Sequence, residues 1–383
     1  MSVRKRAWVT RNGEARESWI VDYSDQQGRH IHTFARKKDA DEYHDKVRVD
    51  VRAGVHTSSK ATVAGAGKRW IESCKAHGLE ASTVESYEQH LSDHILPYLG
   101  IVKLSQLTVP VVRNFMDRLR GDGRSPDMVK RVVGDLGSIL ADAQERGDVA
   151  QNVVRSLSRR KKRREAERRQ KGKLKVGVDI PTPAEIKAIV AHLHGRWRPL
   201  LLTAIFAGLR ASEIRGLRWE DADLKRAELH VRQRADKFKT IGKPKSAAGE
   251  RSIPMPPILV NALREWKLAC PKSELGLVFP TGAGEVEYHS NIVTRGLAPV
   301  QVAANVVAKA RKAKYTGLHA LRHFYASWCI NRKEDGGLGL PLKVVQHRLG
   351  HSSIQMTADV YGHLFPSGDN GAELAAAQKA LLG

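Results

Sequence analysis

The C-terminal half of the chain carries a set of cationic and imidazole side chains that ends in a tyrosine, and together these residue types could transfer a phosphoryl group. The set consists of Arg210, Lys245, His319, Arg322, His351 and Tyr361. Arginine binds phosphate through a planar fork that keeps its charge, imidazoles move protons near neutral pH, and a deprotonated phenol is a nucleophile. The set therefore indicates cleavage of a phosphodiester by a tyrosine, with no metal ion required.

The spacing of these residues along the chain supports this chemistry. His319 and Arg322 are three positions apart in GLHALRHFYAS, which places both on one face of a helix, towards a common phosphate. His351 lies in HRLGHSSIQMT, and Tyr361 follows it by ten positions in ADVYGHLF. A short LGHSS motif followed at this distance by a tyrosine is far rarer by chance than either element alone.

Two further positions complete the pattern. Arg210 ends the apolar run TAIFAGLR, and Lys245 lies in GKPKSAAGERSIP between two candidate strands. In order and spacing, residues 180–365 resemble the tyrosine recombinase (phage integrase) family, whose pattern is Arg, Lys, His-x-x-Arg, His or Trp, and Tyr. The resemblance implies an enzyme that cuts and rejoins DNA through a covalent 3′-phosphotyrosyl bond and a Holliday junction, without a cofactor.

The arginines and the tyrosine receive their roles from their chemistry. Arg210 and Arg322 are expected to clamp the scissile phosphate, because paired guanidinium bonds neutralise its non-bridging oxygens. Tyr361 is expected to lose its proton during attack, since a phenol has an ordinary pKa of about 10. Glu213, three positions after Arg210, matches the family's acidic position and is expected to orient a catalytic side chain.

Proton transfer is assigned to the lysine and the imidazoles. Lys245 is expected to protonate the leaving 5′ oxygen, and its neighbours Lys237, Lys239 and Lys243 are competitors. Two roles stay open for His319, which could accept the tyrosine proton or bind the phosphate. His351 is expected to contact a non-bridging oxygen.

The remaining histidines are expected to be structural. His323 and His347 are assigned to helix or core positions and not to catalysis. His347, His351 and His363 lie close enough in sequence to suggest zinc, but HRLGH lacks the glutamate of H-E-x-x-H and no carboxylate ligand is evident nearby. We therefore expect no metal site and no cofactor.

Charge points to a polyanionic partner. The 383 residues include 65 Lys and Arg against 41 Asp and Glu, which gives a net charge of +24 and a pI near 10.1. No long basic amphipathic helix or lipidation signal favours a membrane surface, and no apolar run approaches the length of a membrane span. The three cysteines are widely spaced and form no C-x-x-C pair. We expect a soluble protein of the bacterial cytoplasm, associated with the nucleoid and bound to double-stranded DNA.

The fold class expected from the chain is mainly α with small antiparallel sheets (α+β), in several domains. Residues 1–56 predict a β-rich module of three strands and a helix, with a hairpin turn at Asn12 and Gly13. This module resembles the arm-type DNA-binding domain of some phage integrases. Residues 57–157 predict an all-α domain, with one helix from Ser82 to Leu96 and another that begins at Ser125 and Pro126. This domain resembles the family's core-binding domain. A basic linker spans 158–178, and 179–383 form the catalytic domain, with a tail from about 367. This domain is expected to open with a helix capped by Thr182 and Glu185 and to contain strands at Leu229–Gln233 and Arg251–Met255.

Candidate DNA contacts are the basic residues of these parts. They are Arg4, Lys5 and Arg6 in the first module, Lys68, Arg69, Arg113, Lys130 and Arg131 in the helical domain, and Arg159, Arg160, Lys161, Lys162, Arg163 and Arg164 in the linker. A block as basic as the linker cannot bury an apolar face, so alone it is a flexible tether. Laid along a duplex, it would make binding steeply dependent on salt.

The leading interpretation is a site-specific integrase of a phage or other mobile element, acting as a homotetramer on synapsed DNA with a possible host bending factor or directionality factor. Two alternatives stay open: an enzyme like a type IB topoisomerase, or a catalytically silent DNA-binding regulator derived from a recombinase. The Ala/Leu-rich segment Ala372 to Leu382 predicts a short helix that packs either on a neighbouring protomer or on its own domain. The DNA target cannot be predicted from the sequence.

Overall fold

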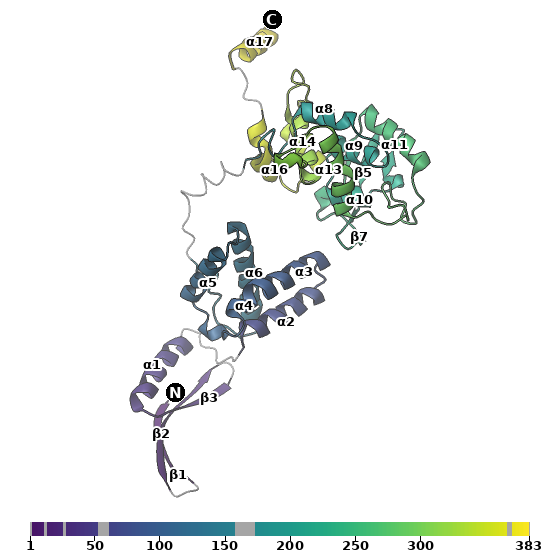
Figure 1. Cartoon of the computed structure of the whole chain (residues 1–383). Coiled ribbons are helices and arrows are strands. Elements are labelled where there is room, and N and C mark those ends of the chain that lie inside the picture. The colour runs from purple at the N-terminus through teal and green to yellow at the C-terminus, as the bar shows by residue number, and fades with distance from the viewer. Residues whose placement is uncertain are drawn as a thin grey trace. The chain divides into compact units, whose positions relative to one another are not determined.

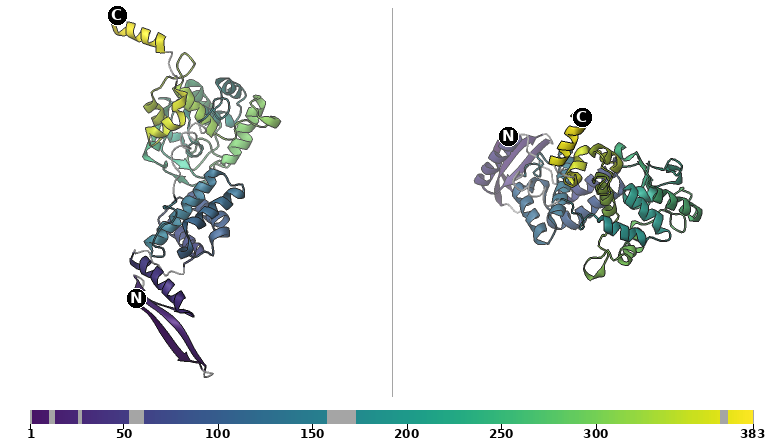
Figure 2. Two further views of the ribbon diagram at one scale, coloured as in Figure 1. Left: turned by 90° about the vertical axis from the view of Figure 1, so that its left-hand side faces the viewer. Right: turned by 90° about the horizontal axis from the view of Figure 1, so that it is seen from above.

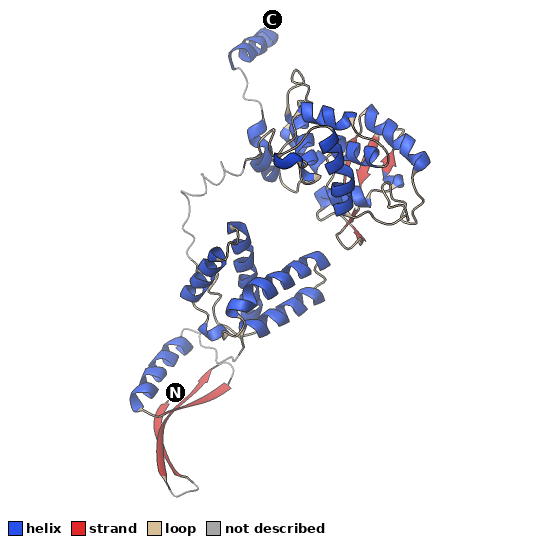
Figure 3. Ribbon diagram, viewed as in Figure 1, coloured by secondary structure: helices blue, strands red, loops and turns tan. Residues whose placement is uncertain are grey.

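The computed structural model describes residues 2–10, 14–25, 28–52, 61–157, 173–365 and 370–382, which belong to two compact units, Met1–Arg160 and Lys161–Gly383. Helices predominate in both units, and the strands form small antiparallel sheets (Figures 1 and 3). The expected class, mainly α with small antiparallel sheets, is confirmed. The division between the units falls in the basic run 158–172, which lies outside the described residues. The finer domain boundaries stay predictions.

The first unit opens with an antiparallel sheet of order β1-β2-β3, formed by β1 (Ser2–Val9), β2 (Ala15–Asp25) and β3 (Gly28–Phe34). The β1–β2 ribbon extends beyond the helix α1 (Lys37–Arg52) that packs on it (Figure 2). Side chains alternate between the two faces of β2, so Val21 and Tyr23 point to the same side and form a small core with Ala40 of α1. Three strands and a helix were expected here, although the turn predicted at Asn12 and Gly13 lies outside the described residues.

The rest of this unit is helical. Its elements are α2 (Val63–Ala76), α3 (Ala81–His90), a π-helical turn (Leu91–Ile95), α4 (Leu96–Leu99), a 3₁₀ turn (Leu104–Gln106), α5 (Val109–Gly121) and α6 (Pro126–Glu145). The α6 helix begins as predicted, because the Ser125 hydroxyl accepts a hydrogen bond from the Met128 backbone N–H at 3.2 Å and Pro126 needs no partner in the first turn. One apolar cluster, which includes Ile95, Phe115 and Leu136, fills the centre of the helices.

The second unit contains most of the elements. Its helices are α8 (Pro183–Ala191), α9 (Trp197–Ala207), α10 (Ala211–Gly216), α11 (Pro257–Ala269), α12 (His289–Asn291), α13 (Ala298–Ala303), α14 (His319–Ile330), α15 (Leu342–Leu349), α16 (Ile354–Tyr361) and α17 (Asn370–Leu382), with a π-helical turn at Ile292–Leu297 and 3₁₀ turns at Trp219–Asp221, Ala247–Gly249, Lys309–Arg311 and Gly362–Leu364. The Thr182 capping box that begins α8 is confirmed by reciprocal bonds with Glu185 of 3.2 and 2.8 Å.

Two small sheets accompany these helices. The strands β4 (Ala222–Asp223), β5 (Glu228–Val231) and β8 (Arg251–Pro254) pair in the order β4-β5-β8, and β6 (Arg234–Ala235) pairs with β7 (Ile241–Gly242). The two longer strands match the predicted ones, but β5 ends two residues earlier than expected. The β6–β7 hairpin was not predicted, since strands of two residues show no alternation to detect.

The α9 helix forms the centre of the second unit. Its residues are buried around almost the whole circumference, Leu200, Leu201, Leu202 and Ile205 among them. The α14 helix packs against α9, and α15 packs against α14. As a result, the segment after α9, the buried face of α14 and the end of α15 meet.

Candidate active site

Arg210 lies in the tight connection between α9 and α10. The α9 helix ends at Gly208, whose φ of 58° is left-handed, and a Cβ there would lie 2.2 Å from the Tyr325 ring. The backbone N–H and Nη1 of Arg210 each donate to the Glu213 carboxylate at 2.8 Å, and Nη2 donates to the carbonyl of Gly350 at 3.0 Å. Because two of its five donors are used in this way, the guanidinium is fixed and still has N–H groups for a ligand.

Glu213 is buried between two arginines. Arg251 of β8 donates from Nη2 to Oε2 of Glu213 at 2.8 Å and from Nη1 to Oε1 at 3.2 Å. Burial alone would raise the pKa of Glu213, but the hydrogen bonds and charge of Arg251, with the charge of Arg210, lower it to about 2. The carboxylate is therefore ionised and holds Arg210 in place through two hydrogen bonds.

Sequence reasoning did not single out Arg251. Besides Glu213, its guanidinium donates to the carbonyls of Arg348 at 2.8 Å and Gly249 at 2.9 Å, so it ties β8 to α10 and to the end of α15. A signal was present in the alternation of RSIP, since Arg251 has the same strand phase as the buried Ile253 and must point inwards.

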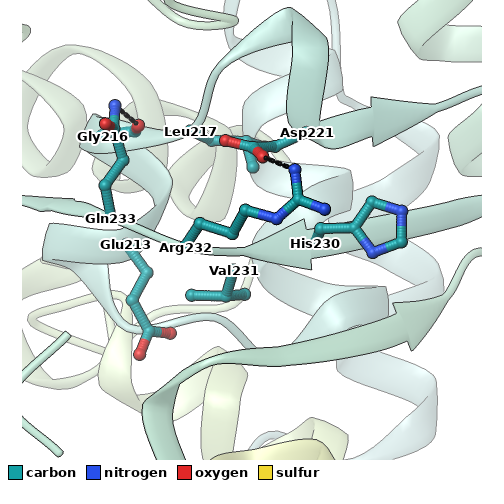
Figure 4. Close-up of a pocket in the computed structure, with 8 residues that line it drawn as sticks. All are labelled: Glu213, Gly216, Leu217, Asp221, His230, Val231, Arg232 and Gln233. Carbon is teal, nitrogen blue, oxygen red and sulfur yellow. Dashed lines mark hydrogen bonds and ion pairs between the residues drawn. The ribbon is translucent and has the colours of Figure 1, made fainter. Parts of the chain in front are cut away.

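A small pocket lies beside Glu213. It is lined by Glu213, Gly216, Leu217, Asp221, His230, Val231, Arg232 and Gln233. Figure 4 shows the Glu213 carboxylate turned away from the ion pair between Arg232 and Asp221, which measures 3.1 Å. Gln233 closes the pocket by donating to the Gly216 carbonyl at 2.7 Å. The pocket therefore belongs to the support of the arginine network and does not open on the other side chains of the site.

Arg322 points inwards from the first turns of α14. It is 2% exposed, and its two terminal nitrogens donate to the carbonyls of Gly208, at 2.7 Å, and Leu349. Burial and the neighbouring charge of Arg210 lower the pKa of Arg322 to about 10, so it stays charged at neutral pH. Two arginines that repel each other are thus held together by backbone carbonyls, an arrangement that an anion between them would stabilise.

His351 and Tyr361 close the site from the other side. The left-handed Gly350 ends α15, and the His351 that follows it bonds through Nδ1 to the Thr357 hydroxyl at 2.9 Å. Tyr361, at the end of α16, is 1% exposed, and its ring lies parallel to that of His351 with centroids 6.3 Å apart. Burial raises the pKa of Tyr361 to about 12, although the charges of Arg322 and Arg210 act in the opposite direction.

His323 was assigned to a helix or core position, and the structure places it beside Tyr361. Its Nδ1 lies 2.7 Å from the hydroxyl of Tyr361. His319, for which acceptance of the tyrosine proton was one of two roles left open, contacts the His323 ring edge to face with centroids 4.6 Å apart. The sequence signal for His323 is its place one residue after Arg322, on the helix face next to His319, but only the packing of α16 against this face shows that it reaches the tyrosine.

His319 itself begins α14 and keeps an exposed side chain. Partial desolvation and the charges of Arg322 and Arg210 lower its pKa below the ordinary value. His347, the other histidine expected to be structural, is exposed on α15. Within the described residues, no three His, Cys, Asp or Glu side chains gather as a metal site.

Lys245 lies between β7 and β8 and is exposed. The 3₁₀ turn Ala247–Gly249 begins two residues later, and the Ala248 carbonyl lies 3.0 Å from where a Cβ on Gly350 would stand. The lysine turn therefore ends beside the residue that precedes His351. Among the competitors, Lys239 lies over the Tyr288 ring at 4.2 Å.

The candidate DNA contacts differ in how far their charges are already paired. Arg4 pairs with Asp22 at 3.3 Å, Lys5 with Glu17 at 2.6 Å, and Arg6 lies over the Trp8 ring at 5.9 Å. In the helical domain, Arg69 pairs with Asp148 and Arg113 is half-buried, whereas the side chains of Lys68, Lys130 and Arg131 are exposed. Arg159, Arg160, Lys161, Lys162, Arg163 and Arg164 lie outside the described residues.

The fold and the site together describe an enzyme of the tyrosine recombinase class. Residues 181–367 match the model of the phage integrase family, and residues 67–120 match that of the phage integrase N-terminal SAM-like domain. The chain belongs to this family. Its relatives include a tyrosine recombinase XerC-like protein of Caldanaerobacter subterraneus subsp. tengcongensis, 27% identical over 357 residues, with 86% of each chain covered.

Solved structures share the fold. The chain is similar to the Tn1549 transposon integrase in complex with transposon right end DNA, with a TM-score of 0.64 and 17% identity over 84% of this chain and all of that one. It is also similar to a lambda integrase dimer bound to a COC′ core site, with a TM-score of 0.56 and 16% identity over 92% and 93% of the two chains. Across the described part of the chain, no helix is long and apolar enough to cross a membrane.

Proposed function

We propose that the chain is the integrase of a phage or other mobile genetic element, which it inserts and excises by site-specific recombination. The observation that carries the proposal is the meeting of two charged arginines, Arg210 and Arg322, with His351 and Tyr361 around one buried site. Similarity to transposon and lambda integrases supports an element integrase, since both of those proteins were solved on DNA.

In the proposed reaction, the scissile phosphate lies between the guanidinium groups of Arg210 and Arg322. The Tyr361 oxygen attacks the phosphorus, the bond to the 5′ oxygen breaks, and Lys245 supplies the proton that this oxygen needs. Nε2 of His351 donates to a non-bridging oxygen, since its Nδ1 is occupied by Thr357. His319, at the exposed end of the same group, contacts the phosphate. The 3′-phosphotyrosyl bond keeps the energy for rejoining, so no cofactor is required.

The other parts of the chain serve DNA binding in this proposal. The helical domain holds the core site with Lys68, Lys130 and Arg131, and the basic linker completes the grip on the duplex. The N-terminal sheet binds a separate arm site with Arg4, Lys5 and Arg6. Four protomers act on two duplexes in the bacterial cytoplasm, and a bending or directionality factor can assist them.

The α17 helix is proposed to contact a neighbouring protomer. Leu374, Leu381 and Leu382 are 66 to 83% exposed, so this helix carries apolar side chains that its own domain leaves uncovered. Deleting residues 367–383 tests the assignment. Loss of assembly on synapsed sites is expected, and unchanged assembly and cleavage would contradict it.

The deciding experiment uses a nicked suicide duplex that carries the element's attachment core, incubated with the protein in EDTA. We expect a covalent protein–DNA band that maps to Tyr361 and disappears in Tyr361→Phe, while DNA binding persists. A band that requires a divalent metal would contradict the mechanism. Binding without any band would favour the silent regulator, and relaxation of supercoiled DNA by a monomer without a partner site would favour the topoisomerase.

A further inference from the structure

The proton of Tyr361 has one evident destination. Within the described residues, the Tyr361 hydroxyl makes a single hydrogen bond, to Nδ1 of His323 at 2.7 Å. At 1% exposure the tyrosine has almost no contact with solvent that could take the proton instead. A phenol must lose its proton to become a phosphate nucleophile, and a proton acceptor must lie within hydrogen-bonding reach.

The surroundings of His323 define its protonation state before DNA binds. Burial, the neighbouring His319 imidazole and the charge of Arg322 lower the pKa of His323 to about 4, while Asp179 opposes them. The ring is therefore neutral, and a neutral ring with an unprotonated Nδ1 accepts the hydrogen bond that the phenol donates. The geometry and the charge state of His323 are those of a base.

The other two imidazoles are less suited to this task. His351 uses Nδ1 to contact Thr357, and its ring is parallel to the Tyr361 ring at 6.3 Å, so its lone pair does not point at the hydroxyl. His319 makes an edge-to-face contact with the His323 ring and is not hydrogen-bonded to the Tyr361 hydroxyl. It is exposed, which suits it to contact the phosphate or to pass a proton from His323 to solvent.

We propose that His323 is the catalytic residue that accepts the proton of Tyr361 during cleavage and returns it during rejoining. The proposal rests on the recombinase function proposed above. In cleavage, the O–H bond of Tyr361 breaks, its proton moves to Nδ1 of His323, and the oxygen forms the bond to phosphorus while the bond to the 5′ oxygen breaks. In rejoining, the imidazolium gives the proton back as the phenol leaves.

Arrival of the substrate makes this transfer feasible. A DNA phosphate between Arg210 and Arg322 offsets the charge of Arg322, which together with burial keeps His323 neutral in the free protein. The same phosphate withdraws electrons from the attacking phenol oxygen in the transition state. Both effects reduce the difference in proton affinity between the imidazole and the phenol at the moment of attack.

The test compares His323→Asn with native protein in single-turnover cleavage of the suicide duplex. Asparagine keeps an oxygen near the position of Nδ1 but cannot take a proton at neutral pH. A second duplex carries sulfur in place of the bridging 5′ oxygen, because a thiolate leaves without a proton. We expect His323→Asn to lower the cleavage rate ~10² to 10⁴-fold on both duplexes, with DNA affinity unchanged.

Two control variants are needed to interpret the result. Lys245→Ala should be slow on the oxygen duplex and recover on the sulfur duplex, as expected of an acid. His347→Asn, a matched change at an exposed helix position, should cleave both duplexes at the native rate. A native rate in His323→Asn, or its recovery on sulfur, would overturn the proposal, and cleavage by the native protein shows that the recombinase function itself stands.

A third comparison separates proton transfer from positioning. Difluorotyrosine at position 361 has a more acidic phenol, so it should raise the cleavage rate of His323→Asn at least about tenfold. Failure to restore it would reduce His323 to a positioning residue and overturn the assignment. If thermal unfolding shows that the asparagine variant does not fold, His323→Gln takes its place in the same assays.

Discussion

Arg251 and Glu213 form a buried ion pair in which Nη2 lies 2.8 Å from Oε2 and Nη1 lies 3.2 Å from Oε1. Through Glu213 this pair also fixes Arg210, which shares the same carboxylate. The network joins a strand, a helix start and a helix end, so one carboxylate couples the stability of the domain to the geometry of the site.

Replacement of that carboxylate should destabilise the domain. Glu213→Gln leaves the buried guanidinium of Arg251 without its counter-charge, which costs about 3 to 5 kcal/mol. Urea unfolding of the variant should show the loss, and its cleavage rate should fall as well because Arg210 is released. Glu220→Gln, at an exposed position paired with Arg218, should stay within about 0.5 kcal/mol of the native protein. Equal stability of both variants would contradict the role assigned to Glu213.

Gly350→Ala tests the helix end beside the site. At a φ of 63° an alanine is strained, and its Cβ would lie 2.8 Å from Nη1 of Arg251 and 3.0 Å from the Ala248 carbonyl. We expect a loss of about 1 to 3 kcal/mol together with slower cleavage, since the Gly350 carbonyl holds Arg210. The control is Gly282→Ala, where a Cβ meets nothing within 4 Å. If the two alanines behaved alike in thermal unfolding, the proposed clash would be excluded.

Acid should destabilise the second unit through His351. Burial and the charges of Arg322 and Arg210 lower the pKa of His351 to about 4, whereas histidine in an unfolded chain titrates at about 6.5. Between these values only the unfolded chain binds the proton. The contribution is therefore complete above about pH 6.5 and is lost as the pH falls towards 4. Urea unfolding at about pH 7.5 and about pH 5 measures the loss, which should be smaller in His351→Gln. The exposed control His347→Gln should keep the native dependence.

Two adjacent basic residues of α2 should respond differently to substitution. Lys68 is exposed, so Lys68→Ala should weaken DNA binding and reduce its salt slope by about one without a change in stability. Arg69 pairs with Asp148, so Arg69→Ala should cost about 0.5 to 1 kcal/mol of stability and change the salt slope less. Salt titrations of binding and thermal unfolding of both variants distinguish the roles. A larger salt effect for Arg69 would show that DNA displaces Asp148.

Local signals predicted much of this fold. The start of α6 at Ser125 and Pro126 and the capping box at Thr182 were both visible because a cap depends on residues a few positions apart. The helix expected from Ser82 to Leu96 instead contains a π-helical turn and continues to Leu99, a change that no single residue type announces.

The residues of the site also differ in whether the sequence alone could identify them. Arg210, Arg322, His351 and Tyr361 could be selected from spacing, and the structure brings them together. The contact of His323 with Tyr361 could not be predicted, because it depends on how α16 lies against α14. Sequence separation hides such a pair when one of its residues, here His323, lies outside the recognised pattern.

Besides the Glu213 carboxylate, the acceptors that hold the two arginines are main-chain carbonyls of Gly208, Leu349 and Gly350. Every residue type has a carbonyl, so substitution of Leu349 by another apolar side chain need not disturb them. Insertion or deletion of one residue would be far more damaging, because it would rotate the end of α9 or α15 and turn these oxygens elsewhere. Over evolution, the lengths of these two connections should therefore be more strictly maintained than the identity of the side chains within them.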